Sequence, residues 1–176
     1  PQKGSFSWIQ GGTGSGKTFT VYRIAQRALS KLKSEGLKKQ SKLSSSIQIP
    51  IYVKASNLNF RTESFKFEDF VFEEIKKYSK SVSMDEVQSW FSEFQVVLIF
   101  DEYEFKTPQA QLNLILKDSS KYTGLSILVL SRILSESQLF FDRSPEIWQM
   151  KEINLANAKR LLHSCIPSEN KKGIQL

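Results

Sequence analysis

Eight consecutive residues near the start of the chain constrain its fold more than any other feature. They read GGTGSGKT and match the pattern G-x-x-x-x-G-K-[ST] at every fixed position. The aromatic and β-branched segment 5–10 before them indicates a strand, and the apolar spacing over residues 21–32 indicates a helix that stops near Gly36. A strand, a glycine-rich loop and a helix N-terminus together form a site for phosphate.

Each residue type in this loop has a physical reason to be there. Glycines adopt backbone conformations closed to other residues, so successive N–H groups can surround phosphate oxygens. Lys17 is expected to reach the β- and γ-phosphates of a nucleotide, and the Thr18 hydroxyl to be a ligand of Mg²⁺. The expected nucleotide-binding residues are Gly11, Gly12, Thr13, Gly14, Ser15, Gly16, Lys17 and Thr18.

A second motif places acids after the short apolar run 96–100 (VVLIF), which is typical of a strand buried on both faces of a parallel sheet. Ligands of open α/β sheets bind beyond the carboxyl ends of the strands, so Asp101 is expected to face the metal held by Thr18. The general base is either Glu102, which we favour, or Glu104. In an extended backbone both would point away from Asp101, but we expect the chain to turn here.

Arg132 follows another buried strand, 125–130, and is expected at the same edge of the sheet. There a guanidinium can neutralise the γ-phosphate, although an ordinary surface arginine is almost as frequent at such a position. We treat Arg132 as a catalytic candidate.

Strands and helices alternate along the chain, which predicts an α/β fold: a parallel five-stranded sheet covered on both faces. Further strands are expected at 47–55, where Pro50 favours a sheet edge or a strand start, and at 146–153. Helices are expected at 67–78, after a capping box of Ser83 and Glu86, from Thr107 to Lys117, at 135–141, and from Asn154 onward. The three tryptophans, Trp8, Trp90 and Trp148, fit core positions.

Composition limits the remaining possibilities. The chain has 176 residues, a net charge of +7 and one cysteine, Cys165, which suits a reducing compartment. No segment reads as a signal peptide or membrane span, so we expect a cytoplasmic protein. Much of the positive charge lies in the Ser-rich stretch 31–42 without interleaved aromatics, which favours a solvated segment over a nucleic-acid patch. His163 and Cys165 lack the further ligands of a zinc site.

The order of features resembles the NACHT-type domain of the STAND class of P-loop NTPases, which is related to AAA+ proteins. The matching pieces are WIQGGTGSGKT, IPIYVKASNL, VVLIFDEYE and SILVLSR, followed by INLANAKRLL as the entry to a helical domain. The resemblance implies a three-layer α/β/α fold with strand order 5-1-4-3-2, a nucleotide-binding domain over 1–153, and a truncated helical domain over 154–176. It also implies that Lys17, Thr18, Asp101 and Arg132 act on ATP and Mg²⁺, and that other domains of a longer chain follow.

The acidic motif departs from the family pattern D-G-x-D-E. Here Asp101 is followed by Glu102, Tyr103, Glu104 and Phe105, so a glutamate replaces the small residue and the final acid is lost. Slow hydrolysis is expected, with either glutamate as base.

Three functions remain open at this stage. The first is a regulatory ATPase that switches between ADP and ATP states and oligomerises in a larger signalling or defence protein. The second is an AAA+-like ATPase acting on DNA, favoured by the basic charge, and the third is a hydrolysis-deficient scaffold stabilised by nucleotide. A GTPase is disfavoured because Glu104 replaces the glycine of D-x-x-G and no N-K-x-D motif is present.

Overall fold

The sheet has five parallel strands. The computed structural model describes residues 4–35, 48–58, 63–104, 109–132 and 143–151. The strands are β1 (Phe6–Gln10), β2 (Gln48–Lys54), β3 (Gln95–Tyr103), β4 (Leu125–Ser131) and β5 (Glu146–Gln149). Their spatial order is β2-β3-β4-β1-β5, with parallel pairing throughout. Read from the other edge, this is the predicted order 5-1-4-3-2, which is confirmed.

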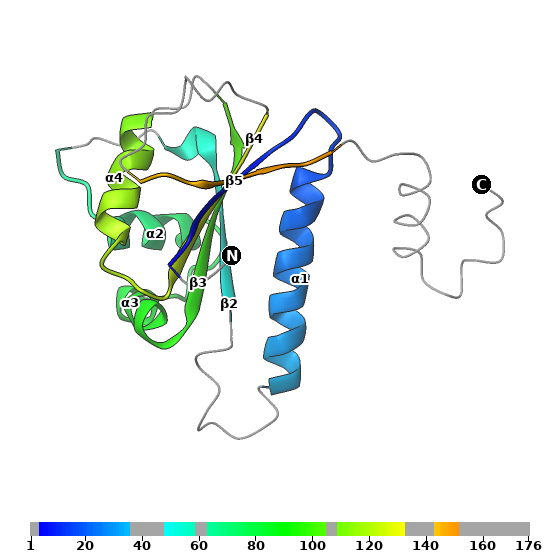
Figure 1. The fold of residues 1–176 in the computed structure, drawn as a ribbon. Helices are drawn as coiled ribbons and strands as arrows, with labels where there is room; N and C mark the ends of the chain where they lie inside the picture. Colours follow the sequence, from blue (N-terminus) through cyan, green and yellow to red (C-terminus); the bar gives the residue numbers. More distant parts are fainter. Residues whose placement is uncertain (1–3, 36–47, 59–62, 105–108, 133–142, 152–176) are drawn as a thin grey trace.

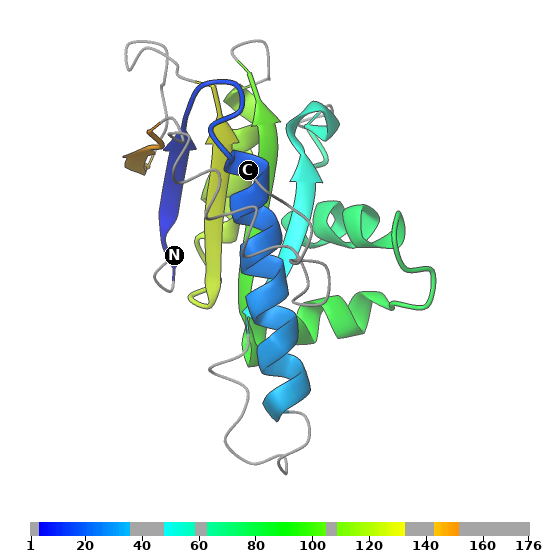
Figure 2. The ribbon, with the colours of Figure 1, turned by 90° about the vertical axis from the view of Figure 1, so that its right-hand side faces the viewer.

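The helices form one layer on each side of the sheet. Helix α1 (Lys17–Glu35) covers one face, and α2 (Phe67–Lys76), α3 (Met84–Glu93) and α4 (Gln109–Ser119) cover the other (Figure 1). A short 3₁₀ turn, η2 (Ala55–Asn57), follows β2. Figure 2 shows α1 in front of the middle strands, with β5 at the far edge beside β1. We call the two sides the α1 face and the α2–α4 face, and the predicted three-layer α/β/α architecture is confirmed.

Local sequence signals explain several element boundaries. Ser83 caps α3: its hydroxyl accepts from the Glu86 N–H, and the Glu86 carboxylate accepts from the Ser83 N–H, which is the expected capping box. Pro50 lies in β2, which pairs only with β3 and is therefore an edge strand. Proline is tolerated there because one side of an edge strand needs no sheet hydrogen bonds.

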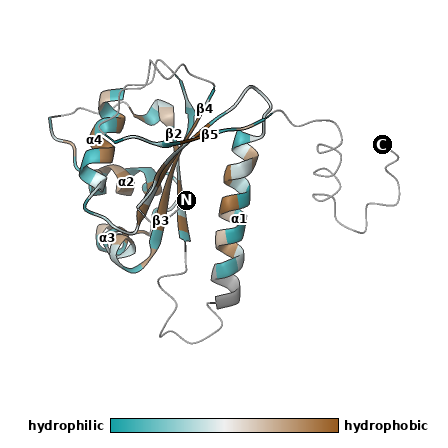
Figure 3. Cartoon of the chain, viewed as in Figure 1, coloured by the Kyte–Doolittle hydropathy of each residue, from teal (hydrophilic) through white to brown (hydrophobic). Residues whose placement is uncertain are grey.

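The hydrophobic core divides between the two faces of the sheet. The larger cluster lies on the α2–α4 face and includes Trp8, Phe67, Phe91, Phe100 and Tyr103. The smaller cluster on the α1 face consists of five buried residues, which are Val21, Val97, Ile99, Leu128 and Leu130. Figure 3 shows the hydrophobic colouring concentrated on the strands between the helix layers. The central strands β3 and β4 contribute side chains to both clusters, which explains why their sequences are continuously apolar.

One expected strand ends earlier than predicted, and three expected helical features lie outside the described residues. Strand β5 ends at Gln149, and Met150 and Lys151 do not extend it to the predicted end. As an edge strand it has only β1 to hold it. The expected helix start at Thr107 and Pro108, the helix at 135–141, and the helical segment 154–176 lie outside the described residues. Within the described ranges, no helix has the length and apolar character needed to cross a membrane.

Candidate functional site

The loop between β1 and α1 has a backbone that requires glycine. Gly14 and Gly16 have φ of 77° and 88°, in the left-handed region that other residues rarely adopt. A side chain at Gly11 would place its Cβ 2.5 Å from the Ser15 hydroxyl, so that position is limited by space. The first helical hydrogen bond runs from the Thr20 N–H to the Gly16 carbonyl. The loop therefore leads directly into the N-terminus of α1, as the sequence predicts.

The Lys17 ammonium folds back over this loop. It donates to the carbonyl oxygens of Gly11 and Gly12, the latter at 2.9 Å, and to the Ser15 hydroxyl at 3.3 Å. Burial lowers the pKa of Lys17, and the nearby Arg132 charge lowers it further, while Asp101 opposes both. A bound phosphate would replace neutral carbonyl partners by an anion, which is the partner that an ammonium binds more strongly.

Thr18 and Asp101 meet although 83 residues separate them in sequence. The Thr18 hydroxyl donates to Asp101 Oδ2 at 3.2 Å. Asp101 is 3% exposed, and its Oδ1 accepts from the backbone N–H of Glu102 at 2.8 Å. In the part of the chain that the structure describes, no lysine or arginine forms an ion pair with this carboxylate.

The donor set at this point fits Mg²⁺. The buried Asp101 carboxylate has no ion-pair partner among the described residues, and the Thr18 hydroxyl lies beside it. Both groups offer hard oxygen donors. Mg²⁺ usually takes few protein ligands and completes its octahedron with waters and substrate phosphates. Among the described residues there is no cluster of three or more His, Cys, Asp or Glu side chains, so a closed all-protein metal cage is not found there. His163 and Cys165 lie outside the described residues.

Strand β3 does not turn after Asp101, which corrects the expectation from sequence. It continues to Tyr103 with a bulge, because Phe100 pairs with Val129 and Tyr103 with Ser131, leaving one extra residue. The irregularity falls at Glu102, whose φ of 59° makes it the one described non-glycine residue with positive φ. The bulge brings Tyr103 onto the α2–α4 face, where its ring meets Trp8 edge-on at 5.0 Å.

The two glutamates of the motif are both exposed. Glu102 stands next to Asp101, and its charge contributes to raising the pKa of the Tyr52 phenol, after burial and Asp101. The negative charge of Glu102 therefore lies near the Thr18–Asp101 pair. Glu104 follows directly after the end of β3. The strained backbone at Glu102 is the kind of feature found at functional sites.

Arg132 follows β4 and is exposed. Its effect on the Lys17 pKa places its charge within electrostatic reach of the loop. The strand end below it is fixed by a buried network, in which Trp8 Nε1 donates to the Ser131 hydroxyl at 2.8 Å and that hydroxyl donates to the Arg132 carbonyl. The Gly11 N–H also donates to the Ser131 carbonyl at 3.2 Å. Arg132 is thus anchored to the start of the loop.

Sequence reasoning assigned no role to Tyr52, although the segment IPIYVKASNL contains it. Its hydroxyl donates to Asp101 Oδ2 at 3.1 Å. Burial and the Asp101 charge raise the pKa of this phenol, so it remains a neutral donor. The strand periodicity would place Tyr52 and Asp101 on one face of the sheet only once the β2–β3 register is known.

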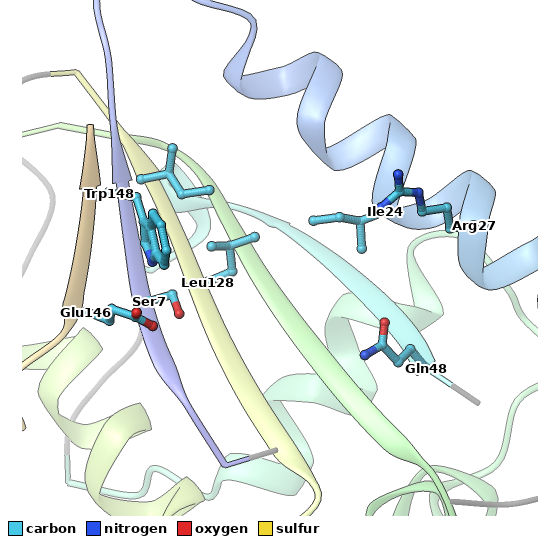
Figure 4. A pocket seen from close by; sticks show the side chains of 8 residues that line it. Ser7, Ile24, Arg27, Gln48, Leu128, Glu146 and Trp148 are labelled. Carbon is cyan, nitrogen blue, oxygen red and sulfur yellow. The ribbon is translucent and has the colours of Figure 1, made fainter. Parts of the chain in front are cut away.

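Trp148 is not a core residue, contrary to expectation. It is 55% exposed, whereas Trp8 is fully buried and Trp90 packs against the core. Trp148 stands on the edge strand β5 and, together with Ile24 and Arg27 of α1, lines a cavity of about 620 Å³ on the α1 face (Figure 4). The lining residues are Ser7, Ile9, Ile24, Arg27, Gln48, Leu128, Glu146 and Trp148. None of them belongs to the loop 11–18 or the Asp101 group, so this cavity is separate from the phosphate site.

Comparison with known proteins shows a shared fold. No protein-family model matches the chain, and no curated protein matches it by sequence. Among solved structures, the chain is similar to PCH-2 of C. elegans, with a TM-score of 0.53 and 17% identity. The match covers 93% of this chain and 40% of the PCH-2 chain. The chain therefore shares an α/β fold with that structure, in agreement with its parallel five-stranded sheet, and the comparisons give no support to the NACHT or STAND class in particular.

Proposed function

We propose that this chain is the ATP- and Mg²⁺-binding domain of a slow regulatory ATPase that belongs to a larger signalling or defence protein. The observation that carries the proposal is the meeting of Lys17, Thr18 and Asp101 at the carboxyl ends of β1 and β3. Open α/β sheets bind ligands at this edge. The glycine conformations at Gly14 and Gly16 give the loop the shape that a phosphate cradle needs.

Each residue has a defined task in this proposal. Mg²⁺, when bound with ATP, neutralises charge on the β- and γ-phosphates. Lys17 leaves the loop carbonyls and contacts those phosphates, while Thr18 and Asp101 supply oxygens on the metal side. A water attacks the γ-phosphorus, the bond to the bridging oxygen breaks, and ADP leaves. Glu102 or Glu104 accepts the proton of that water, and Arg132 compensates the γ-phosphate charge.

Two observations favour alternative functions. The net charge of +7 favours an AAA+-like ATPase acting on DNA, with phosphate contacts that weaken as salt rises. The replaced acids favour a scaffold that binds ATP without hydrolysing it. DNA binding that weakens as the salt concentration rises would support the first alternative. Absence of ATP hydrolysis by the assembled full-length protein would support the second. The proposed regulatory ATPase would switch between ADP and ATP states, and with this switch we also propose nucleotide-dependent homo-oligomerisation and docking to other domains of the same chain.

The phosphate site is tested with Lys17→Ala. Calorimetric titration with Mg²⁺–ATP is expected to show tight binding by the parent protein and none by the variant, because the charge opposite the phosphates is gone. Lys80→Ala, at an exposed lysine on the other side of the sheet, should bind like the parent. Competition should also favour ATP over GTP. Unchanged affinity in a folded Lys17→Ala protein would remove the site assignment.

A further inference from the structure

Tyr52 approaches the metal side of the site from a neighbouring strand. In the β2–β3 register it lies opposite Ile99, two residues before Asp101 on the same face of the sheet. Neighbouring strands lie about 4.8 Å apart and two residues of a strand span roughly 6.6 Å, so the two backbones are roughly 8 Å apart on the diagonal. The aromatic side chain of Tyr52 spans this distance, and its hydroxyl meets the carboxylate of Asp101.

The contacts of Asp101 give Tyr52 a particular place. Oδ2 accepts from Tyr52 at 3.1 Å and from Thr18 at 3.2 Å, and Oδ1 accepts from the Glu102 N–H at 2.8 Å. Thr18 can bind Mg²⁺ through a lone pair of its hydroxyl oxygen and still donate its O–H to Oδ2. Tyr52 is the second side-chain donor on Oδ2 and the one that has no part in binding the metal, while the Glu102 N–H fixes Oδ1.

We propose that Tyr52 is a positioning residue of the metal site: its hydroxyl holds the Asp101 carboxylate in the orientation in which it meets the Mg²⁺ of a bound nucleotide. This inference rests on the proposed function, because it assigns Tyr52 to the same metal. Tyr52 itself does not contact the nucleotide. Its effect passes through Asp101.

The proposal differs from a purely structural role in what it predicts. A hydrogen bond that only stabilises the sheet would affect unfolding and leave the metal dependence of ligand binding unchanged. Groups that orient metal-binding carboxylates typically change metal affinity about 10- to 100-fold when they are removed. The loop and Lys17 contact phosphate independently of Tyr52, so binding of ATP without metal should not depend on it.

Tyr52→Phe tests this by removing one oxygen atom from a half-buried ring. ATP affinity is measured with excess Mg²⁺ and again with EDTA, and the ratio gives the enhancement by metal. We expect the variant to lose about 10-fold of this enhancement and to keep the EDTA affinity. Tyr78→Phe, which removes the hydroxyl of a tyrosine that is 72% exposed after α2, should match the parent in both conditions.

A double-mutant cycle with Asp101→Asn decides whether the effect passes through the carboxylate. Tyr52→Phe should have no further effect in the Asp101→Asn background, because the group that it orients has already been changed. If Tyr52→Phe does not fold, as judged by circular dichroism, Tyr52→Leu removes the same hydroxyl with an aliphatic side chain. Two results would overturn the role of Tyr52 and leave the proposed function standing. One is a metal enhancement in Tyr52→Phe equal to that of the parent, and the other is an equal loss from Tyr52→Phe in the parent and Asp101→Asn backgrounds. A parent protein that binds no ATP in either condition overturns the proposed function and this inference together.

Discussion

The two faces of the sheet differ in what their side chains do. On the α2–α4 face, Phe67 packs against Phe91 and Tyr122 at ring distances of 5.3 and 5.7 Å, and Phe91 stacks on Tyr122 at 4.7 Å. On the α1 face, the buried cluster is small and aliphatic, and Asp101 and Thr18 stand at its end. One face consists mainly of closely packed rings, and the other carries the polar candidate site.

Polar contacts follow the same division. On the α2–α4 face they tie helices together: the Phe67 N–H donates to Asp118, and Lys121 pairs with Glu68 at 2.8 Å. On the α1 face the polar groups converge on Lys17 and Asp101 instead. If the proposed site binds nucleotide, stability and ligand binding depend mainly on different faces of one sheet. Substitutions should therefore separate the two properties.

Phe67→Ala should give the largest change in stability. The ring is fully buried among aromatic neighbours, so its removal leaves a cavity and should lower the free energy of unfolding by about 3–5 kcal/mol. Denaturant titration measures this. The matched control is Tyr22→Ala on α1, where the ring is 69% exposed and the change should stay within about 0.5 kcal/mol. Similar losses in the two variants would contradict the division between faces.

The catalytic base gives the next largest effect and should leave stability unchanged. Glu102→Gln is expected to slow hydrolysis about 100-fold, the usual size of a general-base contribution, while binding remains nearly intact. Single-turnover measurement of ADP formation tests this, with Glu104→Gln in parallel.

The pattern of the two glutamine variants decides which glutamate acts as base. If Glu104→Gln is slow and Glu102→Gln is normal, the base lies two residues later, as in the NACHT-like pattern. If the assembled full-length parent shows no turnover at all, the scaffold function is favoured and the enzyme proposal is wrong.

Trp148→Ala should give the smallest effect. The side chain is exposed beside the cavity of the α1 face, so both the free energy of unfolding, within about 0.5 kcal/mol, and ATP affinity should remain those of the parent. Denaturant titration and calorimetry check the two values. A loss of several kcal/mol would mean that this part of the α1 face is closely packed in solution, and the contrast between the faces would weaken.

The sequence by itself determined the local parts of this molecule. The loop 11–18, the helix after it, the Ser83 capping box and the buried strands β3 and β4 all follow from short patterns of residue type. The motifs also predicted that Lys17, Thr18 and Asp101 lie near one edge of the sheet, because each has a fixed place relative to a strand end. Such features depend on a few consecutive residues, so they can be predicted from the sequence without knowledge of tertiary contacts.

Only the tertiary structure decided the rest. The bulge at Glu102 depends on how β3 pairs with β4. The contact between Tyr52 and Asp101, which are 49 residues apart in sequence, depends on the register between β2 and β3. Trp148 is exposed on β5, and only the order of the strands shows that β5 lies at the edge of the sheet. Strand register and helix placement are set by packing between distant segments, so they emerge only when the chain is folded.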